Sequence, residues 1–144
     1  MADEDLPIGL GQTLSPPYVI ARMMQELQLT PESRVLEIGT GSGFQTAMLS
    51  LMCKQVHSVE LLPELSARAR RTLVENMGLR NISLFVGDGT HGWSDKAPFD
   101  GIITNASVDE IPPALIGQLR EGGRLVIPVD VEEEGQQLEC LVSV

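Results

Sequence analysis

Blocks of apolar residues recur along the chain with two different periods. Short blocks rich in Val, Ile and Leu predict strands at residues 34–38, 55–60, 82–86, 99–104, 123–129 and 138–144. Elsewhere apolar residues return every three or four positions, which predicts helices over residues 18–27, 44–53, 63–77 and 111–119. Residues 1–17 follow neither period and are predicted to be a lead-in segment rich in glycine and proline.

This alternation of strands and helices predicts an α/β fold of the Rossmann-like, doubly wound type, in which helices flank a mostly parallel sheet. One domain is expected over residues 1–144, made of the lead-in segment and a core at 18–144. Ligands of such sheets bind at the carboxyl ends of the strands. The loops that follow residues 38, 60, 86 and 104 are therefore the candidates for a site. Residues 132–134 are expected at the tip of a hairpin.

The stretch Arg34–Gly43, RVLEIGTGSG, leads from a strand into a loop with glycine at alternate positions. We call residues 39–43 the glycine loop; it contains Gly39, Thr40, Gly41 and Gly43. Glycine tolerates φ > 0 and has no Cβ to hold a ligand away from the backbone. The spacing G-x-G-x-G differs from the G-x-G-x-x-G of dinucleotide sites. The loop is expected to bring bare backbone, and the N–H groups of the next helix, against a ligand.

Three acidic residues stand at or near predicted strand ends. Glu37, inside a strand, needs partners: either a ligand ammonium or the N–H groups of the loop that it braces. Glu60 is placed to accept hydrogen bonds from ribose hydroxyls, with a solvated acid before a turn as the alternative. Asp88, between Gly87 and Gly89, suits an exocyclic amine, with an Asp-Gly turn as the alternative. Together they indicate a nucleoside with a charged, amino-acid-like tail and no phosphate.

Composition and net charge indicate which kinds of protein and partner are to be expected. The chain is 42% hydrophobic and 21% charged, as in soluble globular proteins. No apolar run approaches the roughly 20 residues of a membrane helix, and the acidic N-terminus lacks the features of a signal peptide, so a cytoplasmic protein is expected. A net charge of −10 disfavours nucleic acid as a partner. The basic cluster Arg68, Arg70 and Arg71 is interpreted as a solvated helix face.

The cysteines and histidines indicate no metal site. Cys53 and Cys140 are far apart without a CxxC partner, and both are expected to be reduced core residues. His57 and His91 are isolated from other metal-ligand types. His91 has no acid partner in the sequence pattern and is not assigned as a catalytic base.

The motifs quoted so far resemble those of a known enzyme class. VLEIGTGSG, VELL and GDGTHGW look like the cofactor motifs of class I S-adenosylmethionine-dependent methyltransferases. LPIGLGQTLSPP closely resembles the LPIG-GQTIS segment of protein-L-isoaspartate O-methyltransferases, and APFDGIIT, IPPALIGQL and GGRLVIPV continue the match. The resemblance covers essentially all of residues 6–144 and implies the class I methyltransferase fold.

The resemblance also implies a reaction. The family transfers the methyl group of S-adenosylmethionine to the α-carboxylate of L-isoaspartyl residues in aged proteins, and the ester then cyclises to a succinimide. Isoaspartyl proteins and peptides are thus the expected substrates. The carboxylate is already a nucleophile, so the site must supply in-line positioning rather than a strong base.

Site residues follow from the same resemblance. Ser15 corresponds to the active-site serine, and it is also a good N-cap for the helix that begins on the Pro16-Pro17 pair. The resemblance implies that the neighbours of Ser15 flank the cofactor: Thr13, Leu14 and Pro16. It also implies that Glu60 and Leu61 hold the ribose and adenine, and that Gly87 and Asp88 contact the edge of the adenine. Glu37 and the glycine loop complete the expected cofactor site.

The chain departs from the family pattern at both ends. The helical segment before LPIG and the segment past the sixth strand are missing from this sequence. A half-built hairpin with an unpaired edge is therefore expected at residues 123–144. We expect a monomer, with a dimer as the alternative where a second copy covers that edge. Phe44 stands where the family often has Tyr.

Other functions remain open at this point. The chain is alternatively a methyltransferase of the same fold for another carboxylate or small molecule, or a weakly catalytic cofactor-binding module. A NAD-dependent dehydrogenase is disfavoured by the glycine spacing.

Overall fold

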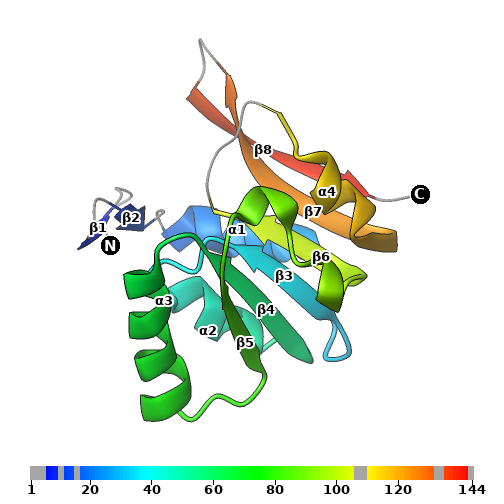
Figure 1. The fold of residues 1–144 in the computed structure, drawn as a ribbon. Helices are drawn as coiled ribbons and strands as arrows, with labels where there is room; N and C mark the ends of the chain where they lie inside the picture. Colours follow the sequence, from blue (N-terminus) through cyan, green and yellow to red (C-terminus); the bar gives the residue numbers. More distant parts are fainter. Residues whose placement is uncertain (1–5, 10–11, 15–16, 106–109, 132–134, 143–144) are drawn as a thin grey trace.

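A computed structural model describes residues 6–9, 12–14, 17–105, 110–131 and 135–142, with side chains at 20–105 and 110–127. Two sheets and their flanking helices make up this part of the chain (Figure 1). The strands are β1 Leu6–Gly9, β2 Gln12–Leu14, β3 Arg34–Ile38, β4 Gln55–Glu60, β5 Ile82–Val86, β6 Phe99–Thr104, β7 Leu119–Val131 and β8 Gly135–Val142. The helices are α1 Pro17–Leu27, α2 Phe44–Ser50, α3 Pro63–Ala69 and α4 Pro113–Gly117, with a π-helical turn at Arg70–Asn76 and 3₁₀ turns at Gly89–His91 and Ser94–Lys96.

The main sheet has six strands in the order β5-β4-β3-β6-β7-β8. Every neighbouring pair from β5 to β7 is parallel, and only β7 and β8 are antiparallel. Strands β3, β4, β5 and β6 occupy the predicted residues. The predicted fold class, a Rossmann-like and mostly parallel sheet, is confirmed.

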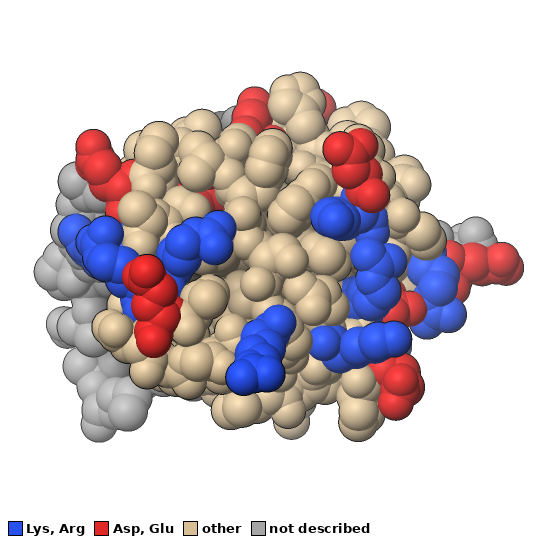
Figure 2. Space-filling view, turned by 60° about the horizontal axis from the view of Figure 1, so that its bottom comes forward, with Lys and Arg blue, Asp and Glu red and all other residues tan. Residues whose placement is uncertain are grey.

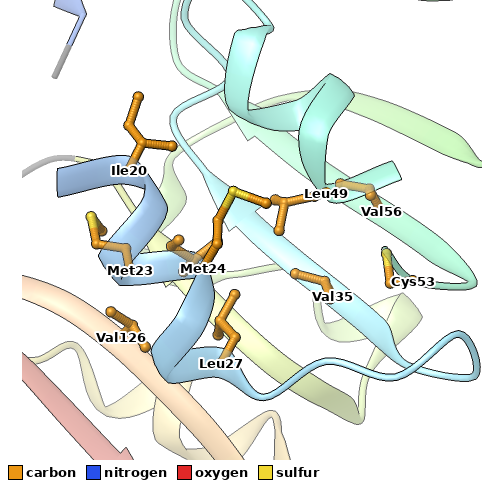
Figure 3. Close-up of a cluster of buried hydrophobic side chains, with 10 residues drawn as sticks. Ile20, Met23, Met24, Leu27, Val35, Leu49, Cys53, Val56 and Val126 are labelled. Atoms are coloured by element: carbon orange, nitrogen blue, oxygen red, sulfur yellow. The ribbon is translucent and has the colours of Figure 1, made fainter. Parts of the chain in front are cut away.

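Alternate residues of the central strand β3 pack on opposite faces of the sheet. Val35 belongs to a buried cluster with side chains of α1 and α2, and Met24 of α1 points toward Leu49 of α2 (Figure 3). Leu36 belongs to a second cluster, which includes Phe99 of β6 and residues of α4 and β7. The helices therefore cover both faces, and the carboxyl end of β3 is held between them.

Three predicted helices have different bounds in the structure. Residues 51–53 do not continue α2, because Met52 donates to the Leu49 carbonyl in a tighter turn at 2.9 Å. The helix predicted at 63–77 changes to π geometry after Ala69, where Met77 donates to the Thr72 carbonyl at 3.0 Å. Gly78, with φ of 70°, ends it as expected. The helix predicted at 111–119 is reduced to α4.

The last two strands also differ from the prediction. Strand β7 begins at Leu119 instead of 123, because Leu119 pairs with Phe99 across a register shift. Strands β7 and β8 pair along their length, from Arg124 opposite Val142 to Val131 opposite Gly135. The expectation of a half-built hairpin was therefore wrong. Residues 132–134, the predicted tip, lie outside the described residues. The outer edge of β8 has no strand partner among the described residues.

The lead-in segment contains regular structure that was not predicted. β1 and β2 pair antiparallel, with Leu6 opposite Leu14 and Pro7 opposite Thr13. Such short strands escape a periodicity analysis because three or four residues show too few alternations. No helix in the described part of the chain is both long and apolar enough to cross a membrane.

Candidate functional site

The glycine loop has the conformation that its sequence predicts. Gly39, Gly41 and Gly43 have φ angles of 93°, 55° and 87°, in the region that L side chains rarely adopt. At Gly43 a Cβ would also come within 3.0 Å of Leu73 Cδ1. Glycine is therefore required there both for backbone conformation and for packing against the helix that follows β4.

Glu60, at the end of β4, fastens this loop. Its Oε1 accepts a hydrogen bond from the Gly41 N–H at 2.8 Å, and its Oε2 accepts one from the Leu62 N–H at 2.9 Å. The side chain is only 6% exposed, so the alternative of a solvated acid is wrong. Each carboxylate oxygen still has a second lone pair. The ribose role of Glu60 stays a prediction.

Glu37 lies under the loop in a fully buried network. Oε1 accepts hydrogen bonds from Ser58 Oγ at 2.6 Å and from Thr46 Oγ1, and Thr40 Oγ1 lies 2.6 Å from Ser58 Oγ. Burial raises the pKa of Glu37 to about 7, although the hydrogen bonds from Ser58 and Thr46 oppose that rise. Glu37 thus joins β3, β4, α2 and the glycine loop.

The two oxygens of the Glu37 carboxylate differ in their hydrogen bonding. Oε2 has no hydrogen-bond partner among the described residues, although the side chain is 0% exposed. An acceptor of this kind suits a ligand ammonium, which stays a prediction.

Asn105 is a site residue that the sequence reasoning missed. It follows β6, and its Nδ2 donates to the Gly39 carbonyl at 2.7 Å while its N–H donates to the Ile38 carbonyl at 3.0 Å. Its place directly after a parallel strand was the available signal, since the loop after residue 104 was among the candidates. Asn105 therefore holds the glycine loop from the side opposite Glu60.

Asp88, after β5, caps a 3₁₀ turn. Its Oδ1 accepts from the Thr90 N–H at 2.9 Å and from Thr90 Oγ1 at 2.8 Å, and these bonds hold the pKa of Asp88 below its usual range. The Asp-Gly turn is thus present, and an adenine role stays a prediction. His91 Nε2 lies 3.6 Å from Asp88 Oδ2, so His91 does have an acid partner, contrary to the expectation.

Gly87 and Gly89 bring this turn close to the rest of the site. The Gly87 N–H donates to the Glu60 carbonyl at 3.0 Å. A Cβ on Gly89 would lie 2.2 Å from Ile38 Cγ2, so only glycine fits there without a shift of β3. The ends of β3, β4 and β5 are therefore in direct contact.

Exposed apolar side chains border the site. Leu61, a predicted cofactor residue, is 67% exposed, and Val86, paired in register with Glu60, is 44% exposed. Val86 was not predicted as a site residue. Two exposed aliphatic side chains beside a carboxylate suit a flat apolar ring with a polar edge.

The predicted residues of the lead-in segment are described less fully. Thr13 and Leu14 belong to β2, and only their backbone is described. Ser15 and Pro16 lie outside the described residues. α1 begins directly after them, at Pro17.

A cavity of about 310 Å³ lies at the amino edge of the sheet, opposite the glycine loop, where it is lined by Ser33, Asp100 and Arg120 among others.

No group of three or more His, Cys, Asp or Glu suited to a metal occurs in the described residues. Arg68, Arg70 and Arg71 are exposed, as predicted. On the face in Figure 2, Lys and Arg stand in separate groups with Asp and Glu among them.

The family model and the curated relatives of this chain indicate the same family. The family model described as "Protein-L-isoaspartate(D-aspartate) O-methyltransferase (PCMT)" matches residues 1–143. The chain is 54% identical over 128 residues to protein-L-isoaspartate O-methyltransferase 1 of Anaeromyxobacter sp. (strain Fw109-5), covering 89% of this chain and 60% of the relative. It is 53% identical over 137 residues to protein-L-isoaspartate O-methyltransferase of Myxococcus xanthus (strain DK1622), covering 95% and 64%.

A solved structure supports the same relationship. A protein-L-isoaspartate O-methyltransferase superposes with a TM-score of 0.84 at 33% identity, over 92% of this chain and 43% of that one. The chain therefore spans less than two thirds of the length of the relatives that are described here.

Proposed function

Because the chain belongs to the protein-L-isoaspartate(D-aspartate) O-methyltransferase family, we propose that it methylates the α-carboxylate of L-isoaspartyl residues in proteins and peptides. S-adenosylmethionine is the proposed methyl donor. The product is a methyl ester, which cyclises to a succinimide when the neighbouring backbone nitrogen displaces methanol. Hydrolysis of the succinimide returns part of the material to normal aspartate.

The observation that carries the proposal is the hydrogen bond between Glu60 and the glycine loop. It fastens a loop with three positive-φ glycines beside a carboxylate, at the edge where parallel sheets bind ligands. Glu60 is proposed to accept hydrogen bonds from the ribose hydroxyls, and Leu61 and Val86 are proposed to pack against the adenine ring. Asp88 is proposed to accept from the exocyclic amine, with Gly87 at the same edge.

The proposed chemistry makes modest demands on the protein. When bound, S-adenosylmethionine would supply an electrophilic methyl group: the carboxylate oxygen would provide the electron pair of the new C–O bond, and the pair of the broken C–S bond would stay on sulfur. No proton moves, so no residue of this chain has to act as a base. The exposed Asp88–His91 pair is accordingly given no catalytic role. Alignment of the carboxylate alone contributes several kcal/mol to such reactions.

Residues of the lead-in segment are proposed to provide that alignment. Ser15, immediately before α1, is proposed to orient the substrate carboxylate through its hydroxyl. Thr13, Leu14 and Pro16 are proposed to flank the cofactor beside it.

A paired-peptide assay tests the proposal. Two peptides that differ only in aspartate or isoaspartate at one position are incubated with the protein and methyl-labelled S-adenosylmethionine. We expect label in the isoaspartyl peptide alone, released as methanol at alkaline pH as a carboxyl ester requires. Equal labelling of both peptides, or label that alkali does not release, would contradict it. Ser15→Ala is expected to lower the rate while calorimetry shows cofactor binding largely kept.

The proposal also covers the oligomeric state, cellular location and partners of the protein. We propose a monomeric cytoplasmic protein of one domain, with residues 1–17 as the lead-in segment, that acts on proteins and not on nucleic acid or membranes. The net charge of −10 supports the exclusion of nucleic acid.

A further inference from the structure

Gln45 is a buried glutamine whose amide has no hydrogen-bond partner among the described residues. It is the second residue of α2 and is 4% exposed. Neither its Nε2 nor its Oε1 forms a hydrogen bond with a described residue. Buried side-chain amides are satisfied in the large majority of cases, so a buried amide with both atoms free indicates a missing partner.

Gln118 shows how this fold treats a glutamine that serves structure alone. It is 9% exposed, and its Oε1 accepts from the Trp93 N–H at 2.8 Å. Its Nε2 donates to the His91 carbonyl, also at 2.8 Å. Both amide atoms of Gln118 are thus paired, whereas neither amide atom of Gln45 is paired with a described residue, and of the two only Gln45 adjoins the glycine loop.

The position of Gln45 along α2 places it at the carboxyl edge of the sheet. Ser50, at the other end of this helix, accepts a hydrogen bond from Asn81 Nδ2 at 2.7 Å, and Asn81 directly precedes β5. The end of α2 therefore lies at the amino edge. Its beginning, where Gln45 follows Phe44, lies at the edge that holds the glycine loop.

The face of α2 that carries Gln45 is turned toward α1. Residues four apart in a helix share a face, so Gln45 lies one turn from Leu49 on the same side. Leu49 packs in the cluster that contains Ile20 and Met24 of α1 (Figure 3). Gln45 is thus directed to the region where α1 begins.

A second unpaired group adjoins the same loop. Thr46, the next residue of α2, donates to Oε1 of Glu37, and Oε2 of Glu37 is also buried without a partner in the part of the chain that the structure describes. Together the two side chains offer two free acceptors, Gln45 Oε1 and Glu37 Oε2, and one free amide donor, Gln45 Nε2. An α-amino-acid end matches this set, because its ammonium needs acceptors and its carboxylate needs a donor.

We infer that Gln45 binds the α-amino-acid end of the methyl donor and of its product, S-adenosylhomocysteine. The inference rests on the proposed function for the identity of the ligand. Gln45 Nε2 donates to the ligand carboxylate and Oε1 accepts from the ammonium. Gln45 thus distinguishes a nucleoside that carries an amino-acid tail from one that lacks it.

Two nucleosides test this assignment by calorimetry. S-adenosylhomocysteine has the amino-acid end, and 5′-methylthioadenosine has the same adenosine and sulfur without it. For Gln45→Leu we expect S-adenosylhomocysteine to bind about 10- to 100-fold more weakly, as for the loss of hydrogen bonds to charged groups. Binding of 5′-methylthioadenosine is expected to stay within about twofold of wild type, because Gln45 does not contact the adenosine.

The melting temperature separates a binding role from a structural one. Leucine leaves no buried amide, so Gln45→Leu is expected to melt at the wild-type temperature or above it. Gln45→Met, which is longer and more flexible, serves as the second variant if leucine does not fit. The matched control Gln118→Leu leaves the Trp93 N–H and the His91 carbonyl without their partner. It is expected to melt at a lower temperature than wild type, with the affinity ratio of the two nucleosides unchanged.

The outcomes are distinct. If the wild-type protein binds neither nucleoside, the proposed function fails and the inference fails with it. If the wild type binds both and Gln45→Leu keeps the wild-type affinity ratio, only the inference about Gln45 is overturned. Equal weakening of both nucleosides would likewise contradict it, because the effect would then not depend on the amino-acid end.

Discussion

The Gly41 N–H donates a 2.8 Å hydrogen bond to Oε1 of Glu60, across 19 positions of sequence. The bond joins the loop after β3 to the end of β4, and the second oxygen of Glu60 holds the turn that leads into α3. The side chain that is proposed to bind ribose therefore also fixes the backbone on which the ligand lies. Substitutions at this residue have to be measured for stability and binding together.

Glu60→Ala is expected to affect both properties. Each hydrogen bond to a charged group contributes about 1.5–3 kcal/mol, so losing two lowers the free energy of unfolding by roughly 3 kcal/mol. S-adenosylhomocysteine is expected to bind at least about tenfold more weakly. Urea unfolding and calorimetry provide the two values.

Glu64→Ala is the matched control for that substitution. Glu64 is an exposed acid in the first turn of α3, and its removal is expected to change stability by less than about 1 kcal/mol. Unchanged binding by Glu60→Ala would contradict the ribose role, whatever the change in stability.

Glu37→Gln tests the buried carboxyl. The pKa of Glu37 is about 7 in the fold against 4.5 for the ordinary group, so the folded state holds the proton more tightly. Its contribution to stability is complete below about pH 4.5 and is lost as the pH rises through 7, on the order of 3 kcal/mol in all. The glutamine variant cannot titrate at this position. Relative to wild type, it is expected to gain stability between pH 5 and pH 8 in urea midpoints; an identical pH profile would contradict the raised pKa.

His57 has the opposite effect over part of the same pH range. It is 4% exposed on β4, and burial, with the charges of Arg34 and Lys96, lowers its pKa from 6.5 to about 4. The unfolded chain takes up this proton first, so stability is lost as the pH falls from about 6.5 to 4. In wild type the two residues partly cancel between pH 4.5 and 6.5. Relative to wild type, His57→Gln is expected to gain stability as the pH falls from about 6.5 to 5, and a variant whose stability follows the wild-type pH profile would contradict this.

Two glycines provide a steric comparison. At Gly89 a Cβ would meet Ile38 Cγ2 at 2.2 Å, whereas at Gly117, in α4, nothing lies within 4 Å. Gly89→Ala is expected to cost about 1–3 kcal/mol by overpacking. Gly117→Ala is expected to be neutral or to stabilise by up to about 1 kcal/mol. Equal melting temperatures for the two variants would show that the turn after β5 shifts freely.

Much of the fold and part of the site followed from residues that are close in sequence. The bounds of β3, β4, β5 and β6 were predicted because each strand is a short block that contains Val, Ile or Leu and ends near turn residues. The positive φ angles of Gly39, Gly41 and Gly43 followed from the sterics of a Cβ, which act within a residue and its neighbours.

The tertiary structure decided what depends on distant partners. The full length of β7 was hidden because its residues 120–123 are polar and glycine-rich, and its early start depends on the pairing of Leu119 with Phe99 of β6. The hydrogen bond from Asn105 to Gly39 joins residues that are 66 positions apart. Ser58 can donate to Glu37 only because β3 and β4 are neighbours in the sheet. Packing also decides that Glu60 is paired with the loop while Gln45 is buried with no partner within the described ranges. A sequence shows which polar side chains are present, whereas the fold determines which of them are left with a hydrogen bond to give.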